Sequence, residues 1–257
     1  MTGPGSPLSN ADSMNEIRDV IIENFDTGAA GSILISAGKT RVLCTASLST
    51  DLPGWLASKE PPSGWISSEY NMLPGSTSPR KRRGTDGRST EIQRLIGRSL
   101  RAMVELTSIP GLSIICDCEV LQADGGTRTA SITGASVSLM IALGAALDDG
   151  RLAAPPTDRL PVELVTAISA GVVDGKCVVD LDYEKDSRAD VDLNAVQNQK
   201  KEWIELQGTG ERAGFSKAQL DEILDLCDAA IDKIRNRQLE FLKKNLSANA
   251  TRILLGA

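Results

Sequence analysis

Basic side chains are concentrated in one short stretch of an otherwise acidic sequence. The 257 residues carry 28 Lys and Arg against 34 Asp and Glu, a net charge of −6. The concentrated basic residues are Arg80, Lys81, Arg82, Arg83, Arg88, Arg94, Arg98 and Arg101. The last three fall on the polar face of a predicted helix, where a solvated, salt-bridged surface is the ordinary interpretation. The loop arginines before them repel one another, which favours contact with a polyanion or an acidic partner surface.

A glycine-rich segment, Asp124–Ala130 (DGGTRTA), lies between a predicted apolar strand and a predicted apolar helix. Glycine lets the backbone approach an anion, a helix N-terminus offers free N–H groups, and Arg128 adds a guanidinium. The segment matches neither the dinucleotide-binding fingerprint nor the Walker A motif. It is therefore interpreted either as a phosphate cradle or as a simple strand-to-helix turn.

A run of carboxylates follows in the second half of the chain: Asp180, Asp182, Glu184, Asp186, Asp190 and Asp192. If one strand continued through this run, Asp180 and Asp186 would lie roughly 20 Å apart at ~3.3 Å per residue. They can share a site only if the strand ends between them. Clustered carboxylates can hold a divalent cation or protonate a leaving oxygen. A charged edge strand facing solvent is the alternative.

The composition excludes several kinds of chemistry. There is no histidine, which removes imidazole bases, serine-hydrolase triads and most zinc sites. Aromatic residues make up 3% of the chain, which argues against a stacking platform for bases. The cysteines are Cys44, Cys116, Cys118, Cys177 and Cys227. Without a C-x-x-C pair they indicate a reducing compartment. Cys116 and Cys118 lie two apart in an apolar run, so in a strand they share one face and are interpreted as core residues. No apolar stretch of about 20 residues and no signal sequence is apparent, so a cytoplasmic protein without a membrane partner is expected.

The pattern of apolar residues predicts a chain that begins with sheet and ends with a long helix. Strands are predicted near residues 17–23, 32–35, 40–48, 65–70, 112–121, 161–172, 176–183 and 203–206, and helices near 90–106, 129–147 and from 216 onward. Capping boxes are predicted at Thr90–Gln93 and Ser216–Gln219. Residues 1–12, in which Gly3–Ser6 resembles a cloning remnant, are predicted to be disordered, and the tail 246–257 to be frayed or partner-dependent.

These groups, in this order, resemble the ribonuclease PH family of phosphorolytic exoribonucleases, to which the ring subunits of the exosome are related. The most specific blocks are EIQRLIGRSLR (Glu91–Arg101) and LQADGGTRTA (Leu121–Ala130). The resemblance covers about residues 17–242 and also includes Gly31-Ser32, Thr40–Ser47 (TRVLCTAS), Gly64-Trp65, Glu69–Pro74, Gly87-Arg88, Asp180–Asp186, Asp192-x-Asn194 and Glu205-x-Gln207-Gly208-Thr209.

The resemblance implies an α+β fold with two pseudo-repeated βαβ-type halves in one domain, here residues 13–245, and a homo-oligomer, usually a hexameric ring of dimers. It implies a nucleotidyltransferase that removes 3′-terminal nucleotides from tRNA precursors with inorganic phosphate, releases nucleoside diphosphates and uses Mg²⁺. The positions that match phosphate-binding residues are Arg88, Gly126, Thr127 and Arg128. Asp180 and Asp186 match the catalytic carboxylates and are the candidate metal ligands. Arg80, Arg82 and Arg83 are the candidate RNA-binding residues.

The sequence also departs from the family pattern. Gly5–Ser9 stands where an Arg-x-x-Gly-Arg element is usual, Pro74–Thr77 replaces Pro-Arg-Ser-Thr, and the basic loop is shorter. The alternative function is a catalytically silent, RNA-binding ring subunit. Retention of the arginines and carboxylates above favours the enzyme. A hydrolytic nuclease is disfavoured, because the chain offers neither a histidine base nor a clear two-metal ligand set.

Overall fold

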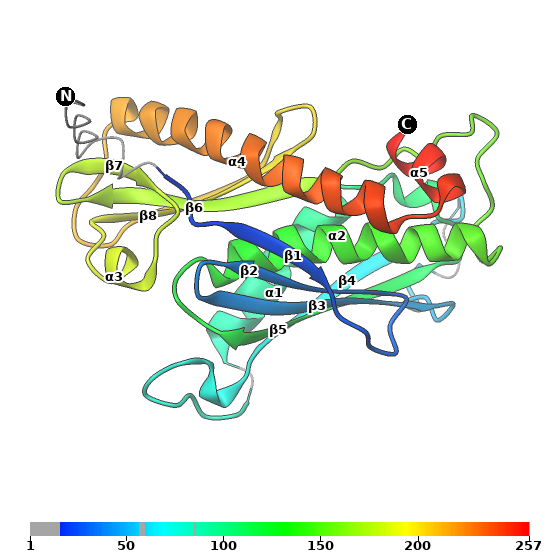
Figure 1. Cartoon of the computed structure of the whole chain (residues 1–257), viewed down its shortest axis with the longest axis horizontal. Coiled ribbons are helices and arrows are strands. Elements are labelled where there is room, and N and C mark those ends of the chain that lie inside the picture. The colour runs from blue at the N-terminus through cyan, green and yellow to red at the C-terminus, as the bar shows by residue number, and fades with distance from the viewer. Residues whose placement is uncertain (1–15, 57–59, 85, 257) are drawn as a thin grey trace, which may run out of the picture.

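The computed structural model describes residues 16–56, 60–84 and 86–256, so the segment predicted to be disordered, residues 1–12, lies outside it. Two β-sheets and the helices that cover them make up the fold (Figure 1). In the described residues the strands are β1 (Val20–Asn24), β2 (Gly31–Ala37), β3 (Thr40–Ser49), β4 (Trp65–Met72), β5 (Ser113–Gln122), β6 (Val165–Val173), β7 (Lys176–Val179), β8 (Val191–Asn198) and β9 (Trp203–Gly210). The helices are α1 (Gly87–Arg101), α2 (Thr127–Asp148), α3 (Tyr183–Asp186), α4 (Lys217–Asn245) and α5 (Ala248–Leu255).

The first sheet has the strand order β1-β2-β3-β5-β4. β1, β2 and β3 form the predicted antiparallel meander, whereas β4 and β5 are parallel and are joined through α1. Side chains alternate along β5: Cys116 and Cys118 are buried, Asp117 between them is partly exposed, and Ile115 before them is 40% exposed. The two thiols are therefore core side chains, as their spacing predicted.

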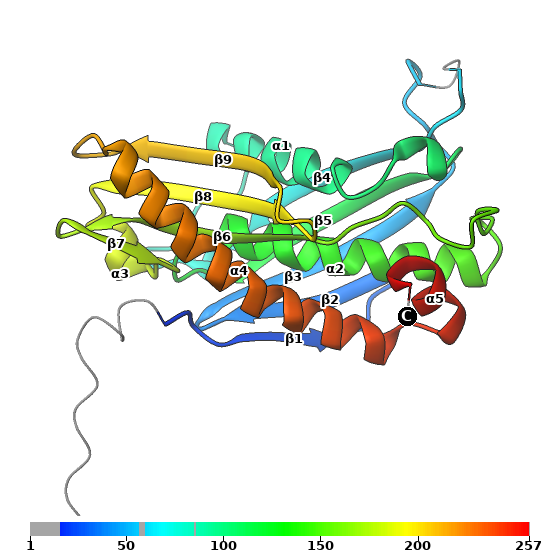
Figure 2. The same cartoon turned by 90° about the horizontal axis from the view of Figure 1, so that it is seen from above.

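The second sheet has the order β7-β6-β8-β9 and is antiparallel throughout. The long helix α4 runs along it, packs on β6 and β7 and also reaches β1 and α2 (Figure 2). Ser216 and Gln219 form the predicted capping box at its start. Each half thus pairs a sheet with a long helix, which confirms the predicted α+β organisation in two halves.

Helix α2 joins the two halves, because it packs on β2 and β3 of the first sheet and on β6 of the second. By length and composition it could cross a membrane, and the prediction that no segment reaches that length is wrong for α2. Serine and threonine residues interrupt the apolar residues of α2, so the sequence shows no continuous apolar run of that length. Most of its residues are buried, and the Ser138 hydroxyl donates to the Cys44 carbonyl at 2.9 Å. α2 is therefore the central core helix of this fold.

Helix α1 begins and ends earlier than predicted. Its N-cap is Asp86, whose carboxylate accepts a hydrogen bond at 2.7 Å from the third backbone N–H of the helix. The predicted Thr90–Gln93 capping box is therefore wrong, because Thr90 already lies inside the first turn. The helix ends at Arg101 rather than Leu106, because the chain then leads into an isolated β-bridge at Val104.

The second half differs from the prediction at two places. The strand predicted to reach Tyr183 stops at Val179, because Asp180 adopts a left-handed backbone with φ +58° and a helical turn follows. No strand was predicted between residues 183 and 203, but β8 lies there, and all of its residues except Asp192 are buried. The strand end is what allows the later carboxylates to turn back toward the first half.

The C-terminal tail is folded, so the prediction of a frayed segment over residues 246–257 is wrong for the part that the structure describes. Helix α5 is capped by Ser247, whose hydroxyl accepts from the Ala250 N–H at 3.0 Å. Ile253 and Leu254 are at most 1% exposed and pack in the core, where α5 contacts α2. The short amphipathic pattern of this helix completes the apolar cover of α2.

Candidate active site

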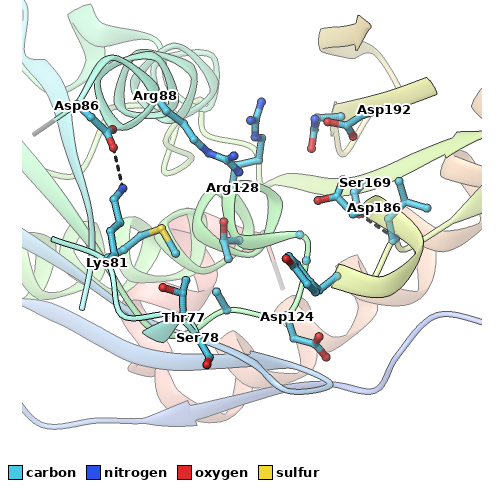
Figure 3. Close-up of a pocket in the computed structure, with 18 of the residues that line it drawn as sticks. Thr77, Ser78, Lys81, Asp86, Arg88, Asp124, Arg128, Ser169, Asp186 and Asp192 are labelled. Carbon is cyan, nitrogen blue, oxygen red and sulfur yellow. Dashed lines mark hydrogen bonds and ion pairs between the residues drawn. The ribbon is translucent and has the colours of Figure 1, made fainter. Parts of the chain in front are cut away.

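A cavity of about 650 Å³ opens between the two halves of the molecule. One wall is the glycine loop (Asp124–Gly126) with the start of α2, and another is the carboxylate segment (Asp180–Asp192), which spans α3 and the start of β8. Arg88, Arg128, Asp186 and Asp192 all line this cavity (Figure 3). A volume of this size is ordinary for a small-molecule or cofactor site.

The glycine loop needs glycine at both of its glycine positions. Gly125 and Gly126 have φ angles of +76° and +65°, a region that disfavours L side chains. A Cβ on Gly125 would lie 2.3 Å from the Leu181 carbonyl oxygen. Thr40 fixes the loop from β3, because its hydroxyl donates to the Gly125 carbonyl at 2.7 Å and accepts from the Asp124 N–H at 2.9 Å. The loop is therefore rigid and presses against the carboxylate segment.

Helix α2 presents its N-terminus to the cavity. Its N-cap is Gly126, which has no side chain to satisfy the first backbone N–H groups. Thr127 follows, buried at the base, where its hydroxyl lies 2.9 Å from the Tyr70 hydroxyl. Burial raises the pKa of Tyr70, so this phenol stays neutral beside Thr127. Free N–H groups and the positive end of a long helix dipole make this an anion site.

Two arginines enter the cavity from different helices, Arg88 from the first turn of α1 and Arg128 from the first turn of α2 (Figure 3). The Arg128 guanidinium donates to the Gln207 side chain of β9 at 2.8 Å and lies 3.6 Å from the Glu91 carboxylate. Gln207 in turn donates to Glu91 at 2.6 Å. Arg128 is thus held by residues of both halves while it faces the cavity.

Asp186 and Asp192 face these arginines across the cavity. Partial desolvation raises the pKa of Asp186, against the opposing effect of the two arginines. Burial likewise raises the pKa of Asp192, and the neighbouring charge of Asp186 raises it further. Two neighbouring carboxylates whose pKa values are both raised can divide the roles of proton carrier and charged ligand.

Asp180 does not line this cavity with Asp186. Its carboxylate is 6% exposed and forms an ion pair with Arg18, with Nη2 of Arg18 2.6 Å from Oδ1. The Arg18 Nε and backbone N–H both donate to Oδ2, at 3.0 and 2.7 Å. The structure therefore brings together Arg88, Gly126, Thr127, Arg128 and Asp186 of the predicted site, and it places Asp180 behind the glycine loop.

The basic residues outside the cavity fall into two groups. Arg80, Arg82 and Arg83 are exposed on the loop before α1, and Arg82 and Arg83 line a second cavity of about 300 Å³ with Lys81. The arginines on α1 are used differently. Arg98 pairs with Glu205 of β9 at 2.5 Å, and Arg101 stacks 4.8 Å from the centre of the Trp65 ring. Arg101 is half-buried, although the helical pattern predicted a solvated face for all three helix arginines.

Sequence reasoning missed the residues that support the site. Arg18, Thr40, Tyr70 and Gln207 contact the glycine loop or the first turn of α2 from four different strands or strand ends. Thr40, Tyr70 and Gln207 lie in blocks that resemble the family, but no local pattern assigned them a role, because each lies far along the chain from the residue it supports. Asp192 was noticed in the acidic run, but only the β8 backbone shows that it faces the cavity.

A helix N-terminus and two arginines set against carboxylates define an enzyme that acts on phosphate groups. Residues 16–143 match domain 1 of the 3′ exoribonuclease family, and residues 163–227 match domain 2. The chain belongs to the 3′ exoribonuclease family.

Curated relatives cover nearly the whole chain. Ribonuclease PH of Rhodopirellula baltica is 49% identical over 245 residues, which span 91% of this chain and 96% of that protein. Ribonuclease PH of Crocosphaera subtropica is 44% identical over 234 residues, 90% of this chain and 95% of that protein. With relatives this similar over this share of both proteins, the chain is a phosphate-dependent 3′→5′ exoribonuclease, as the resemblance implied.

Solved structures show the same fold at lower identity. An Archaeoglobus fulgidus exosome with RNA bound to the active site gives a TM-score of 0.72 at 24% identity, covering 87% of this chain and 89% of that one. Rice Rrp46 gives a TM-score of 0.70 at 19% identity, covering 91% of this chain and 100% of that one.

Proposed function

We propose that the cavity between the glycine loop and the carboxylate segment carries out phosphorolysis at the 3′ end of RNA, with the 3′ tails of tRNA precursors as substrate. The observation that carries this proposal is the facing arrangement of Arg88 and Arg128 with Asp186 and Asp192 across one cavity. A phosphate ion and a phosphodiester are both anions, so their approach requires cationic groups on one side and a proton source on the other.

Inorganic phosphate would be held by Arg88, Arg128, the Thr127 hydroxyl and the free N–H groups at the Gly126 end of α2. An oxygen of that phosphate attacks the phosphorus of the last phosphodiester, and the bond from that phosphorus to the 3′ oxygen of the preceding nucleotide breaks. The terminal nucleotide leaves as a nucleoside diphosphate. The arginines offset the repulsion between the two anions and stabilise the charge on the equatorial oxygens.

Asp186 would supply the proton to the departing 3′ oxygen. Its raised pKa keeps part of the population protonated nearer to neutral pH than an ordinary aspartate. Asn194 and Ser169 line the same cavity and offer neutral hydrogen-bond partners to ribose or phosphate. The chain before the terminal nucleotide would leave past the exposed Arg80, Arg82 and Arg83, which contact phosphates without reading sequence.

Mg²⁺ fits the Asp192 side of the cavity. No group of three or more acidic or cysteine side chains suited to a metal occurs in the described part of the chain. Mg²⁺, however, commonly uses only one or two carboxylates together with substrate phosphates and water. Asp192 has a carboxylate whose charge is disfavoured by burial and by Asp186, and a cation would relieve both effects. The ion would supply charge neutralisation to the phosphate oxygens.

We further propose that the protein acts in the cytoplasm as a closed ring of identical subunits, a hexamer built as a trimer of dimers. The fold is shared with subunits of ring-forming exosome cores. The mass of the purified chain, measured by light scattering, checks this stoichiometry against a monomer or dimer.

The activity is tested with a purified protein, Mg²⁺ and a tRNA whose 3′ end carries extra nucleotides, with and without inorganic phosphate. Nucleoside diphosphates that appear only with phosphate support the proposal. Nucleoside monophosphates without phosphate would indicate a hydrolase. RNA binding without any product would indicate a silent ring subunit. An unstructured RNA of equal length shows whether the tRNA body contributes to recognition.

A further inference from the structure

The chain contains two tyrosines, which lie in opposite environments. Tyr70 is 1% exposed, and its hydroxyl lies 2.9 Å from the Thr127 hydroxyl at the base of the cavity. Tyr183 is 66% exposed, the highest value among the large hydrophobic side chains exposed in the described chain, and it lines the same cavity. Single exposed apolar side chains are common on protein surfaces, but this one belongs to the wall of a substrate cavity.

The backbone that carries Tyr183 is fixed beside the proposed proton donor. Tyr183 is the first residue of α3, whose N-cap Asp182 accepts a hydrogen bond from the Lys185 N–H at 2.8 Å. The Tyr183 carbonyl accepts from the Ser187 N–H at 3.0 Å. Asp186 follows three residues later, so the two side chains are neighbours on one face of this turn, and both line the cavity. An aromatic ring therefore lies next to the carboxylate that faces the arginines.

The ring of Tyr183 has no aromatic or cationic stacking partner within the described residues. The aromatic pair there is Trp55 with Trp65, and the cation–π contact is Arg101 over Trp65. Every nucleobase has a π face that can stack on an aromatic side chain, and such stacking tolerates any base. A tyrosine ring has few rotatable bonds, so it loses little entropy on binding. Tyr183 is therefore suited to bind a base.

The direction of the RNA determines which base reaches this ring. Figure 3 shows Lys81, from the basic loop before α1, on one side of the cavity and Asp186 and Asp192 on the other. The preceding part of the RNA is proposed above to leave past that basic loop. The phosphodiester under attack lies between the arginines and Asp186, so the nucleotide on its far side from the basic loop is the 3′-terminal one. That nucleotide therefore lies on the side of α3.

We propose that Tyr183 stacks on the base of the 3′-terminal nucleotide and holds it while inorganic phosphate attacks, so that Tyr183 is a substrate-binding residue that accepts any base. This inference rests on the function proposed above. An enzyme that removes one nucleotide at a time needs to bind only one base at this position, so a single ring suffices in a chain with 3% aromatic residues. The low aromatic content argues against an extended stacking platform, but not against one stacking position.

The test begins with two substitutions at the same position. Tyr183→Ala removes the ring, and we expect kcat/KM for a 3′-tailed RNA to fall by about 5- to 100-fold, with the KM for inorganic phosphate unchanged. Tyr183→Phe keeps the ring and should retain the wild-type kcat/KM. Phe25→Ala is the control for removing an exposed ring, because Phe25 is 42% exposed and does not line the cavity, and it should also leave kcat/KM unchanged. Equal losses in Tyr183→Ala and Tyr183→Phe would overturn stacking, because the hydroxyl would then account for the effect.

An RNA that lacks its terminal base tests the partner of the ring. Removing the base of the 3′-terminal nucleotide should lower kcat/KM of the wild-type protein by about the same factor as Tyr183→Ala. Combining the two changes should add little, because both remove one contact. Removing the second base from the 3′ end instead should leave the full effect of Tyr183→Ala. Additive losses when the terminal base is absent would overturn the proposal.

A binding measurement separates the base site from the proposed reaction. ADP and pyrophosphate share a diphosphate group, and only ADP carries a base. Calorimetric titration should show an ADP affinity about 5- to 100-fold lower in Tyr183→Ala and unchanged in Tyr183→Phe and Phe25→Ala, with equal pyrophosphate affinity in all four proteins. This result would support the base site even if no diphosphate were released from RNA. Equal ADP affinity in the wild type and Tyr183→Ala would overturn the base site and leave the reaction standing.

Discussion

The glycine loop and the carboxylate segment form opposite walls of one cavity, but they are built in different ways. The glycine loop is local: it follows a buried strand, precedes a buried helix, and its anion-binding groups lie within five consecutive residues, Asp124–Arg128. The carboxylate segment is not local, because its orientation depends on a left-handed turn at Asp180 and on Arg18 from the start of the described chain. A site can therefore combine one wall that a short sequence motif specifies with another wall whose position only the whole fold specifies.

The comparison also separates two kinds of chemistry. The wall with the glycine loop binds a co-substrate through fixed donors and should mainly govern the KM for phosphate. The wall with the carboxylates carries groups whose pKa values are raised and should mainly govern the chemical step. Substitutions on the two walls are therefore expected to differ in which kinetic constant changes.

The largest effect is expected on the carboxylate wall. Asp186→Asn removes the proton donor to the 3′ oxygen while keeping the shape of the side chain. We expect kcat to fall by about 10²- to 10⁴-fold with little change in the KM for phosphate. The measurement is the rate of diphosphate release at saturating RNA and phosphate, with Asp182→Asn as the control, since Asp182 caps α3 instead of lining the cavity. An Asp186→Asn protein with normal kcat would remove Asp186 from the mechanism.

A smaller loss with a different kinetic signature is expected on the glycine-loop wall. Arg128→Ala removes one of the two guanidinium groups and the link to Gln207. We expect kcat/KM for phosphate to fall by about 10²- to 10³-fold, mostly through KM. Arg98→Ala is the control, because Arg98 pairs with Glu205 of the same strand β9 but lies outside the cavity. Equal losses in the two variants would mean that β9 attachment, not phosphate binding, is what Arg128 provides.

The comparison also explains which parts could be predicted from the sequence. The meander, α2, the α4 capping box and the glycine loop follow from patterns within a few residues of one another, and all are present. The end of β7 could not be predicted, because the residue that stops it, Asp180, is a polar residue inside an alternating pattern that is compatible with a longer strand. Its left-handed backbone is favoured by three bonds from Arg18, which no local pattern reveals.

The supporting residues were missed for the same reason. Thr40 and Tyr70 look like ordinary strand residues, and their roles depend on which strand ends lie next to the first turn of α2. The α1 arginines show the reverse case. A basic helix face was consistent with RNA binding, but Arg98 pairs with Glu205, as the salt-bridged interpretation predicted, and Arg101 is half-buried against Trp65.

A third prediction sharpens the electrostatic side of the comparison. Burial raises the pKa of Asp192 above its value in the unfolded chain, so ionising it at neutral pH costs folding free energy. Asp192→Asn should therefore raise the free energy of unfolding by about 0.5–1 kcal/mol at pH 7 without Mg²⁺. The gain should shrink as the pH falls through the raised pKa of the folded state and should disappear below about 3.9, the ordinary aspartate value, where the carboxyl is protonated in both states.

Denaturant unfolding at several pH values measures this gain, and the same variant should need more Mg²⁺ for activity. Asp221→Asn on α4 is the control for removing a surface carboxylate, because Asp221 is 56% exposed in its side chain and pairs only with Lys217 among the ion pairs of the described chain. Destabilisation of Asp192→Asn at pH 7 would contradict the view that this charge is held at a cost in the folded protein.

The smallest effect on catalysis is expected outside both walls, at the loop before α1. Arg80, Arg82 and Arg83 are exposed, so replacing all three with Ala should leave the phosphate KM unchanged. It should weaken RNA binding by about 10-fold at low salt and flatten the dependence of RNA affinity on salt concentration, because fewer phosphate contacts release fewer counterions. Arg237→Ala on α4, also exposed, is the control, and binding is measured by anisotropy of a labelled 3′-tailed RNA. If the triple variant keeps the full salt dependence, RNA reaches the cavity by another route. The glycine loop and the carboxylate segment alone would then account for RNA binding.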